Sequence, residues 1–211
     1  MKPDFLQYLK DHVVLADGAL GTYLFEKGVG RDHNLDLLNL QNSELVFSAH
    51  EEYIRSGSQL IETNTFGANT FKLRDAGAED QVRQINRAGA EIASKAAGHQ
   101  VYVAGSVGPT VVPFPLDEGD VSEEEIRQAF REQMAGLVDG GVDLLIIETF
   151  SNLEEILLAI ESAKEVAPDK PLVAQMVFTA KGLTVRGEDA LHCGRKMAAA
   201  GADVVGTNCG R

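Results

Sequence analysis

Three side chains that could do chemistry follow apolar runs of the sequence. Asp17 follows the run that starts at Val13, and Glu148 lies near the end of "DLLIIETF". Two carboxylates converging on one pocket would bind a substrate ammonium group or act as general acid and base. Cys209 directly follows the run from Ala202, where a buried structural cysteine and a functional one are equally compatible with the sequence. A single thiol does not define a zinc site, which needs about four ligands.

Neighbouring residues extend or limit this candidate site. The backbone N–H groups of Gly18 and Ala19, in the turn after Asp17, could receive an anionic carboxylate. Instead of binding a ligand, Glu148 could form a salt bridge with a neighbouring helix. Glu62, inside "LIETN", is expected to face a helix or to be paired within the fold, outside the site. A histidine metal pair is not expected, because the five histidines are scattered along the chain and none is predicted to end a strand: His12, His33, His50, His99 and His192.

Six apolar runs rich in Val, Ile and Leu would position these groups. They start at residues 13, 59, 101, 143, 171 and 202, and helical patterns alternate with them. Two helix starts are predicted from Ser122 with Glu125 and from Ser151 with Glu154. Glycines at 57, 141 and 201 are predicted to end helices just before strands. Cys193 falls within one of the helical patterns and is predicted to be a small helix-face residue.

Strand–helix alternation predicts a parallel sheet, either a doubly wound open sheet or a (β/α)₈ TIM barrel. Polar residues follow many of the predicted strands, and this distribution favours the barrel, since an open sheet gathers its site at one switch point. Because six units are found where the barrel has eight, we expect residues 1–211 to be the N-terminal portion of one barrel domain. Strands seven and eight are then expected after Arg211.

Composition narrows the class of protein. The net charge of −13 argues against nucleic acid as a partner, and no apolar run or leader predicts a membrane segment. Two cysteines cannot form a disulfide framework, so a cytoplasmic setting is expected. The Walker loop, the dinucleotide-binding glycine pattern and the Gly-x-Ser-x-Gly elbow are all absent from the sequence.

Five stretches taken together resemble the homocysteine S-methyltransferase domain, as found in cobalamin-dependent methionine synthase and in proteins fused to methylenetetrahydrofolate reductase. They are "ADGALGT" (16–22), "ETNTFGAN" (62–69), "GSVGPT" (105–110), "IIETFSN" (146–152) and "GTNC" (206–209). The resemblance implies a barrel with zinc held by three cysteine thiolates, of which Cys209 matches the first. The other two would form an adjacent pair, which this sequence lacks and which is expected beyond Arg211.

The same resemblance implies roles for the remaining site residues. Asp17 and Glu148 would bind the ammonium group of homocysteine, and the amides of Gly18 and Ala19 its carboxylate. Phe150 stands where betaine-dependent relatives carry a tyrosine, which favours the methionine-synthase-like and reductase-fused branches. The implied reaction is zinc-dependent methyl transfer to the homocysteine thiolate, forming methionine.

The methyl donor and the wider context stay open at this point. Methylcobalamin, a folate-derived donor and a small methyl-sulfonium compound are all compatible with the sequence, as are downstream cobalamin, folate or reductase domains. Two other functions also remain. One is an inactive barrel fragment that buries its open sheet edges against a partner. The other is an unrelated barrel lyase or aldolase that uses Asp17 or Glu148 as an acid–base group.

Overall fold

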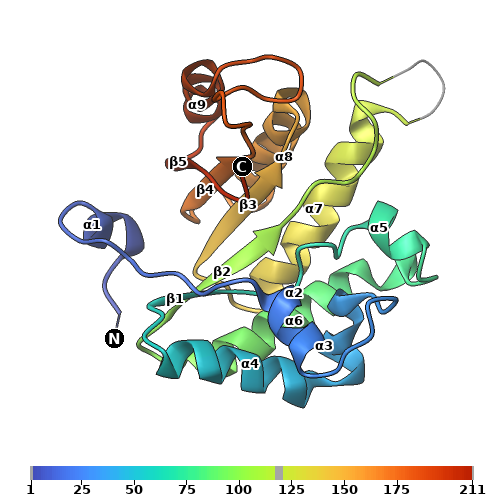
Figure 1. Ribbon diagram of the computed structural model, residues 1–211, viewed down its shortest axis with the longest axis vertical. Helices are drawn as coiled ribbons and strands as arrows, with labels where there is room; N and C mark the ends of the chain where they lie inside the picture. Colours follow the sequence, from blue (N-terminus) through green and yellow to red (C-terminus); the bar gives the residue numbers. More distant parts are fainter. Residues whose placement is uncertain (1, 117–120, 211) are drawn as a thin grey trace.

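Five parallel strands form one sheet in the computed structural model, which describes residues 2–116 and 121–210. The strands pair in sequence order: β1 (Leu60–Glu62), β2 (Tyr102–Val107), β3 (Leu144–Phe150), β4 (Leu172–Met176) and β5 (Val204–Thr207) (Figure 1). The helices are α1 (Phe5–Leu9), α2 (Leu20–Glu26), α3 (Leu38–Gln41), α4 (Ser43–Arg55), α5 (Thr70–Arg74), α6 (Val82–Ala97), α7 (Glu123–Asp139), α8 (Leu153–Val166) and α9 (Ala190–Ala199). Short 3₁₀ turns lie at Leu35–Leu37 and Glu79–Gln81.

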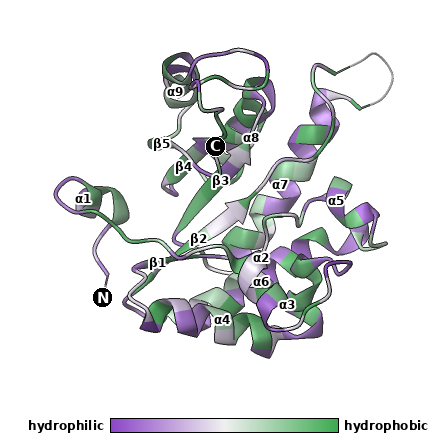
Figure 2. Cartoon of the chain, in the orientation of Figure 1, coloured by the Kyte–Doolittle hydropathy of each residue, from purple (hydrophilic) through white to green (hydrophobic). Residues whose placement is uncertain are grey.

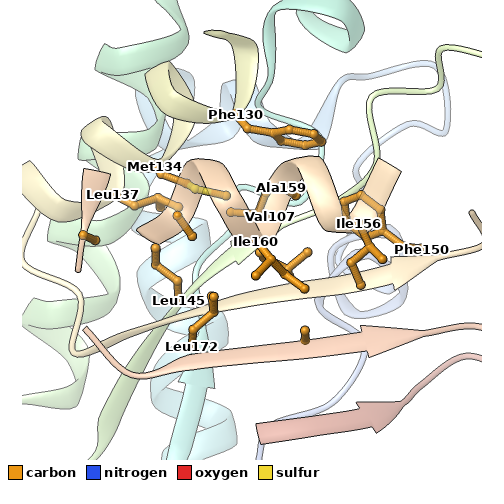
Figure 3. Packing of buried hydrophobic residues seen from close by; sticks show 14 of the residues in the cluster. Val107, Phe130, Met134, Leu137, Leu145, Phe150, Ile156, Ala159, Ile160 and Leu172 are labelled. Atoms are coloured by element: carbon orange, nitrogen blue, oxygen red, sulfur yellow. The ribbon is translucent and has the colours of Figure 1, made fainter. Parts of the chain in front are cut away.

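Helices α6, α7 and α8 cover one face of the sheet and bury the main hydrophobic core. In Figure 3, Met134 and Leu137 of α7 lie on the side of Leu145 of β3, and Ile156 of α8 lies beside Phe150 at the end of the same strand. The central strands are hydrophobic along most of their length because both faces are covered, as expected for strands of a parallel sheet. The helices carry both hydrophobic and hydrophilic residues, since only one side of each faces the core (Figure 2).

A smaller cluster lies on the other face of the sheet. It contains one or two residues from each of β1 to β4, with Phe5 of α1 packed against them. The Phe5 ring meets Tyr102 edge-on at a centroid distance of 5.2 Å. Along each strand the residues alternate between this inner face and the helix-covered face, which is the two-residue period of a β-strand.

The predicted helix signals are confirmed, with one correction. Ser122 and Glu125 form the reciprocal capping box at the start of α7. The start of α8 was wrong by one residue: Asn152, not Ser151, is the cap, and its side-chain oxygen accepts from the backbone N–H of Glu155 at 3.2 Å. Both residue types are good helix caps, so the sequence pattern does not distinguish the two positions. Glycines 57, 141 and 201 adopt positive φ at the predicted helix ends.

The prediction of a strand starting at Val13 is wrong. The segment from Val13 joins the sheet through a single parallel bridge, between Ala16 and Leu60, so the described residues contain five strands and this bridge. The segment hydrogen-bonds to β1 and to the residue before it: Gln59 N–H donates to Leu15 O at 2.7 Å, and Asp17 N–H donates to Leu60 O at 3.0 Å. Val13 is 90% exposed. In the described part of the chain this run therefore has one hydrogen-bonded neighbour, and Val13 and Leu15 are exposed while Val14 packs against the inner-face cluster.

The sheet is open in the described part of the chain. Its two edges are β5 and the Ala16 bridge, so neither barrel closure nor a count of six strand–helix units is observed there. The exposure of β5 reflects its edge position, because Val205 is 41% exposed while Val103 at the centre is buried. None of the helices in the described ranges is both long and apolar enough to cross a bilayer.

Candidate functional site

A cavity of about 790 Å³ lies at the carboxyl ends of the strands. Every strand of the sheet contributes at or just past its end, and the turn before α2 closes one side. The structure brings all five predicted site residues to this cavity: Asp17, Gly18, Ala19, Glu148 and Cys209. The carboxyl ends of parallel strands meet at one edge, so groups far apart in sequence become neighbours there.

Glu148 is held in place by hydrogen bonds from β2 and from the residue that follows β5. Ser106 Oγ of β2 donates to its Oε1 at 2.6 Å, and Asn208 Nδ2, just past β5, donates to its Oε2 at 2.9 Å. Asn208 also donates to Thr149 Oγ1 at 2.8 Å and accepts from the Thr149 backbone N–H at 3.0 Å. Among the described residues Glu148 has no salt-bridge partner, so the alternative of an ion pair with a neighbouring helix is not observed.

The backbone around Glu148 is irregular. Thr149 has a φ of 63°, uncommon for a residue with a Cβ, and the register of β3 with β4 shifts between Ile147 and Phe150. Such a shift bends a strand and re-aims side chains beside functional sites. Here it turns the Thr149 N–H toward the Asn208 side chain, which links the ends of β3 and β5.

Asp17 is anchored through one carboxylate oxygen only. Its Oδ2 accepts from the backbone N–H of Glu62 at 3.0 Å, while Oδ1 is buried and has no hydrogen-bond partner within the described residues. Burial, followed by a weaker repulsion from Glu148, raises the pKa of Asp17 to about 7, although backbone hydrogen bonds oppose the shift. Oδ1 is thus an acceptor at the cavity without a donor.

Glu62 is the carboxylate that the sequence reasoning left out of the site. It lines the cavity with Asp17 and Glu148, so the predicted helix-facing orientation is wrong. No salt bridge pairs its side chain within the described residues, so the predicted pairing within the fold is not observed either. Burial first, then the negative charges of Glu148 and Asp17, raise its pKa to about 9. Strand alternation could have found it: Ile61 faces the helices, so Leu60 and Glu62 must share the inner face.

The turn after Asp17 presents free backbone donors at the cavity. In the described part of the chain, the N–H groups of Gly18 and Ala19 make no hydrogen bond. A Cβ on Gly18 would lie 3.2 Å from the ring of Tyr53, so this position favours glycine through close packing against α4. Phe66 also lines the cavity, and its aromatic ring packs against Gly108, the residue that follows β2.

The two cysteines differ sharply in environment. Cys209 is exposed at the cavity, with its Sγ 3.9 Å from Thr149 Oγ1 and a φ of 50°. Cys193 is buried on α9, as predicted for a helix-face residue, and burial raises the pKa of its thiol to about 11. Histidine is absent from the cavity lining.

A zinc site needs more ligands than this cavity offers. Within the described ranges, no three His, Cys, Asp or Glu side chains are arranged to hold a metal ion. The cavity offers one thiol, while zinc in a structural or catalytic site takes at least three protein ligands, preferably sulfur or nitrogen. The described residues by themselves therefore do not fit a complete zinc site.

Comparison with known proteins agrees with this arrangement. The family model of homocysteine S-methyltransferase matches residues 14–211. The chain belongs to this family. It is 29% identical to methionine synthase of Mycobacterium leprae and 28% identical to that of Mycobacterium tuberculosis, over 98% of this chain in each case. The chain spans 18% of the length of each of these relatives.

Solved structures of the homocysteine methyltransferase MmuM from Escherichia coli share the fold. The metallated form aligns with a TM-score of 0.80 at 25% identity, over 96% of this chain and 77% of that one. The apo form aligns with a TM-score of 0.73 at the same identity, over 95% of this chain and 74% of that one. The family predicted from the five sequence stretches is thus confirmed.

Proposed function

We propose that this chain contributes the homocysteine-binding part of an enzyme that transfers a methyl group to the homocysteine thiol, forming methionine. The observation that carries the proposal is the convergence of Asp17, Glu148 and Cys209 on one cavity in a chain of this family. The lyase or aldolase alternative has no separate observation in its favour.

Asp17 and Glu148 bind the ammonium group in this proposal. Asp17 Oδ1 is a buried acceptor that has no donor among residues 2–116 and 121–210, and an ammonium group supplies up to three N–H donors and a positive charge. Glu148 is fixed by Ser106 and Asn208, so its carboxylate is oriented before the ligand arrives. Preorganised acceptors cost little ordering entropy on binding, which makes charge-assisted hydrogen bonds here effective.

The placement of the ammonium group also sets where the carboxylate and the sulfur of the amino acid lie. The free N–H groups of Gly18 and Ala19 receive the carboxylate, and the side chain runs toward Thr149 and Cys209. A free thiol has a pKa of about 8.5 and is mostly protonated at neutral pH, so methyl transfer requires a means of forming the thiolate. Cys209 is proposed as one zinc ligand for that purpose. The described residues do not by themselves complete the metal site.

The wider protein is part of the same proposal. Residues 1–211 would be the first portion of one (β/α)₈ barrel domain within a longer methionine-synthase-like or reductase-fused protein of the cytoplasm. The remaining strands and two further thiolate ligands would lie outside this chain. The methyl donor would be methylcobalamin or a folate derivative, carried by other domains. The much greater length of the mycobacterial relatives supports this arrangement.

Calorimetric titration of the intact protein with L-homocysteine tests the substrate assignment. Glu148→Gln keeps the size of the side chain but removes the charge, and should weaken binding at least about tenfold. Glu154→Gln is the matched control, because Glu154 is an exposed carboxylate six residues further on at the start of α8. Equal homocysteine affinity in wild type and Glu148→Gln would remove Glu148 from the site.

Metal content tests the role of Cys209. In the intact protein, Cys209→Ser should lose most of its bound zinc by elemental analysis, since serine is a poor zinc ligand. Cys193→Ser should retain zinc, because Cys193 lies on α9 among core residues. Full zinc occupancy in Cys209→Ser would contradict the assignment.

A further inference from the structure

Two carboxyl groups line the cavity besides those of Asp17 and Glu148, namely those of Asp36 and Glu62. Asp36 has partners of its own, because its Oδ1 accepts from the backbone N–H of Gly67 at 3.1 Å and the positive charge of Lys72 acts on it. Glu62 ends β1 and lines the cavity beside Asp17 and Glu148. Its backbone N–H donates to Asp17 Oδ2, so the two residues are fixed relative to each other. The carboxyl groups of Asp17, Glu62 and Glu148 come from three separate segments of the chain, which argues that the fold brings them together specifically.

Three negative charges cannot coexist in this cavity without a counter-charge. Burial penalises each carboxylate, and the repulsion between neighbouring carboxylates penalises ionising all of them together. The groups facing Glu62 are Asp17, from the turn before α2, and Glu148, from β3. Both are acidic, and a proton is the means of relieving such repulsion when no cation is bound.

The other ionisable groups packed around these carboxyl groups do not replace that proton. Tyr53 of α4 faces Asp17, and burial with the Asp17 charge raises its pKa, so it stays neutral. The positive charge of Lys72 in α5 interacts more strongly with the Asp36 carboxylate than with Glu148. Its ammonium group lies 4.4 Å from the centroid of the Phe66 ring. In the described part of the chain, no Lys or Arg forms an ion pair with any of the three carboxylates.

We propose that Glu62 is a third carboxyl group of the amino-acid site, which carries a proton in the free protein and releases it to solvent when a ligand ammonium group binds between Asp17 and Glu148. This inference rests on the proposed binding of an amino acid in the cavity. The ammonium cation supplies the missing positive charge, so the ionised form of Glu62 becomes favourable only in the complex. Binding is thereby coupled to pH, and neutral ligands of the same shape gain nothing from the coupling.

Calorimetry with L-methionine in the intact protein tests the inference. Methionine has no S–H group, so a released proton cannot come from the ligand thiol. Titrations in phosphate and in Tris at about pH 7 should give different binding heats, corresponding to release of about one proton, and affinity should rise with pH over this range. Equal heats with measurable binding would overturn the inference and leave the proposed function standing. If neither methionine nor homocysteine binds, the proposed function fails and this inference fails with it.

Variants assign the proton to a residue. Glu62→Gln mimics the protonated side chain but has no proton to lose, and proton release should fall to less than about a third of the wild-type value. Glu79→Gln, at an exposed glutamate of the 3₁₀ turn Glu79–Gln81, should release as much as wild type. Unchanged release in Glu62→Gln would show that another group holds the proton.

A ligand analogue keeps the test decisive if Glu62→Gln does not fold. The desamino analogue of methionine retains the carboxylate and the thioether but has no ammonium group. Wild-type protein should bind it without releasing a proton, and its affinity should not rise with pH. Proton release on binding this analogue would overturn the link between the ligand ammonium and Glu62.

Discussion

The two faces of the sheet use the same strands for different purposes. Residues such as Ile61, Val103 and Leu145 face helices α6 to α8 and lie in an apolar core. The inner face begins as apolar residues, including Leu60 and Ile146, and becomes polar toward the strand ends. The inner positions that follow are polar on four consecutive strands: Glu62, Ser106, Glu148 and Gln175.

The contrast shows that residues that stabilise the fold and residues that face the cavity can be adjacent on the same strand. On β3, Ile147 is fully buried against the helices, and Glu148 beside it faces the cavity. Because successive side chains point to opposite faces, a strand can carry a packed residue and a ligand-binding residue side by side. Substitutions on one face should therefore change stability, and those on the other should change ligand binding.

The largest expected effect is on the helix-covered face. Phe130 of α7 is fully buried and packs against Phe150, with ring centroids 6.0 Å apart. Phe130→Ala should lower the free energy of unfolding by about 3–5 kcal/mol, because it removes buried apolar area and leaves a cavity. Urea denaturation measures this loss. At temperatures where the variant is folded, its homocysteine affinity should equal that of wild type, and a large drop in affinity would mean that the two faces are not separable.

The next effect concerns a buried base on the outer layer. His50 of α4 is fully buried, neither ring nitrogen has a partner within the described residues, and burial lowers its pKa to about 4. The unfolded chain binds a proton to this residue below about pH 6.5, while the folded chain does not until about pH 4. His50 therefore makes stability fall as pH drops through this window.

His50→Leu removes that acid sensitivity. Its stability relative to wild type should increase by up to about 3 kcal/mol as the pH falls from 6.5 to 4, measured by urea denaturation at several pH values. His192→Gln is the control, because His192 is exposed on α9 and should follow wild type. If His50→Leu and wild type differ by the same amount at every pH, His50 does not carry the effect.

The inner face should show the opposite pH dependence. Raised pKa values of about 7 for Asp17 and about 9 for Glu62 mean that the folded chain binds more protons than the unfolded chain from mildly acidic to alkaline pH. Their contribution to stability is full at low pH and is lost as pH rises through these values. Glu62→Gln should reduce the loss between neutral pH and about pH 9 by at least ~1.4 kcal/mol, the equivalent of one pKa unit. A variant as alkali-sensitive as wild type would contradict this.

The smallest effect is at a helix start. Asn152 caps α8 by accepting from the backbone N–H of Glu155. Asn152→Ala should cost about 1 kcal/mol in thermal or urea unfolding, because one backbone donor loses its partner. Ser151→Ala at the neighbouring position is the control and should cost less. The reverse order would restore Ser151 as the cap.

Much of the fold could be read from apolar runs because the central strands have cover on both faces. The four runs from residues 59, 101, 143 and 171 became β1 to β4, and glycines 57, 141 and 201 end helices as predicted. The run from Val13 has the same composition but forms only a bridge. Sequence patterns indicate which residues favour a strand, whereas the extent of hydrogen bonding to a neighbouring strand depends on the tertiary structure. Edge strand β5 pairs with β4 along its length, while the run from Val13 meets β1 through a single bridge.

The sequence by itself determined the family and which residue types end the strands, since both are local properties of short stretches. Only the tertiary structure decided which of those groups meet. It placed Glu62 beside Asp17 and Glu148, tied Asn208 to Glu148, and separated Cys193 from Cys209. The physical reason is that burial and the distance between charges set the protonation and partners of a carboxylate, and both arise only when distant strands are brought together.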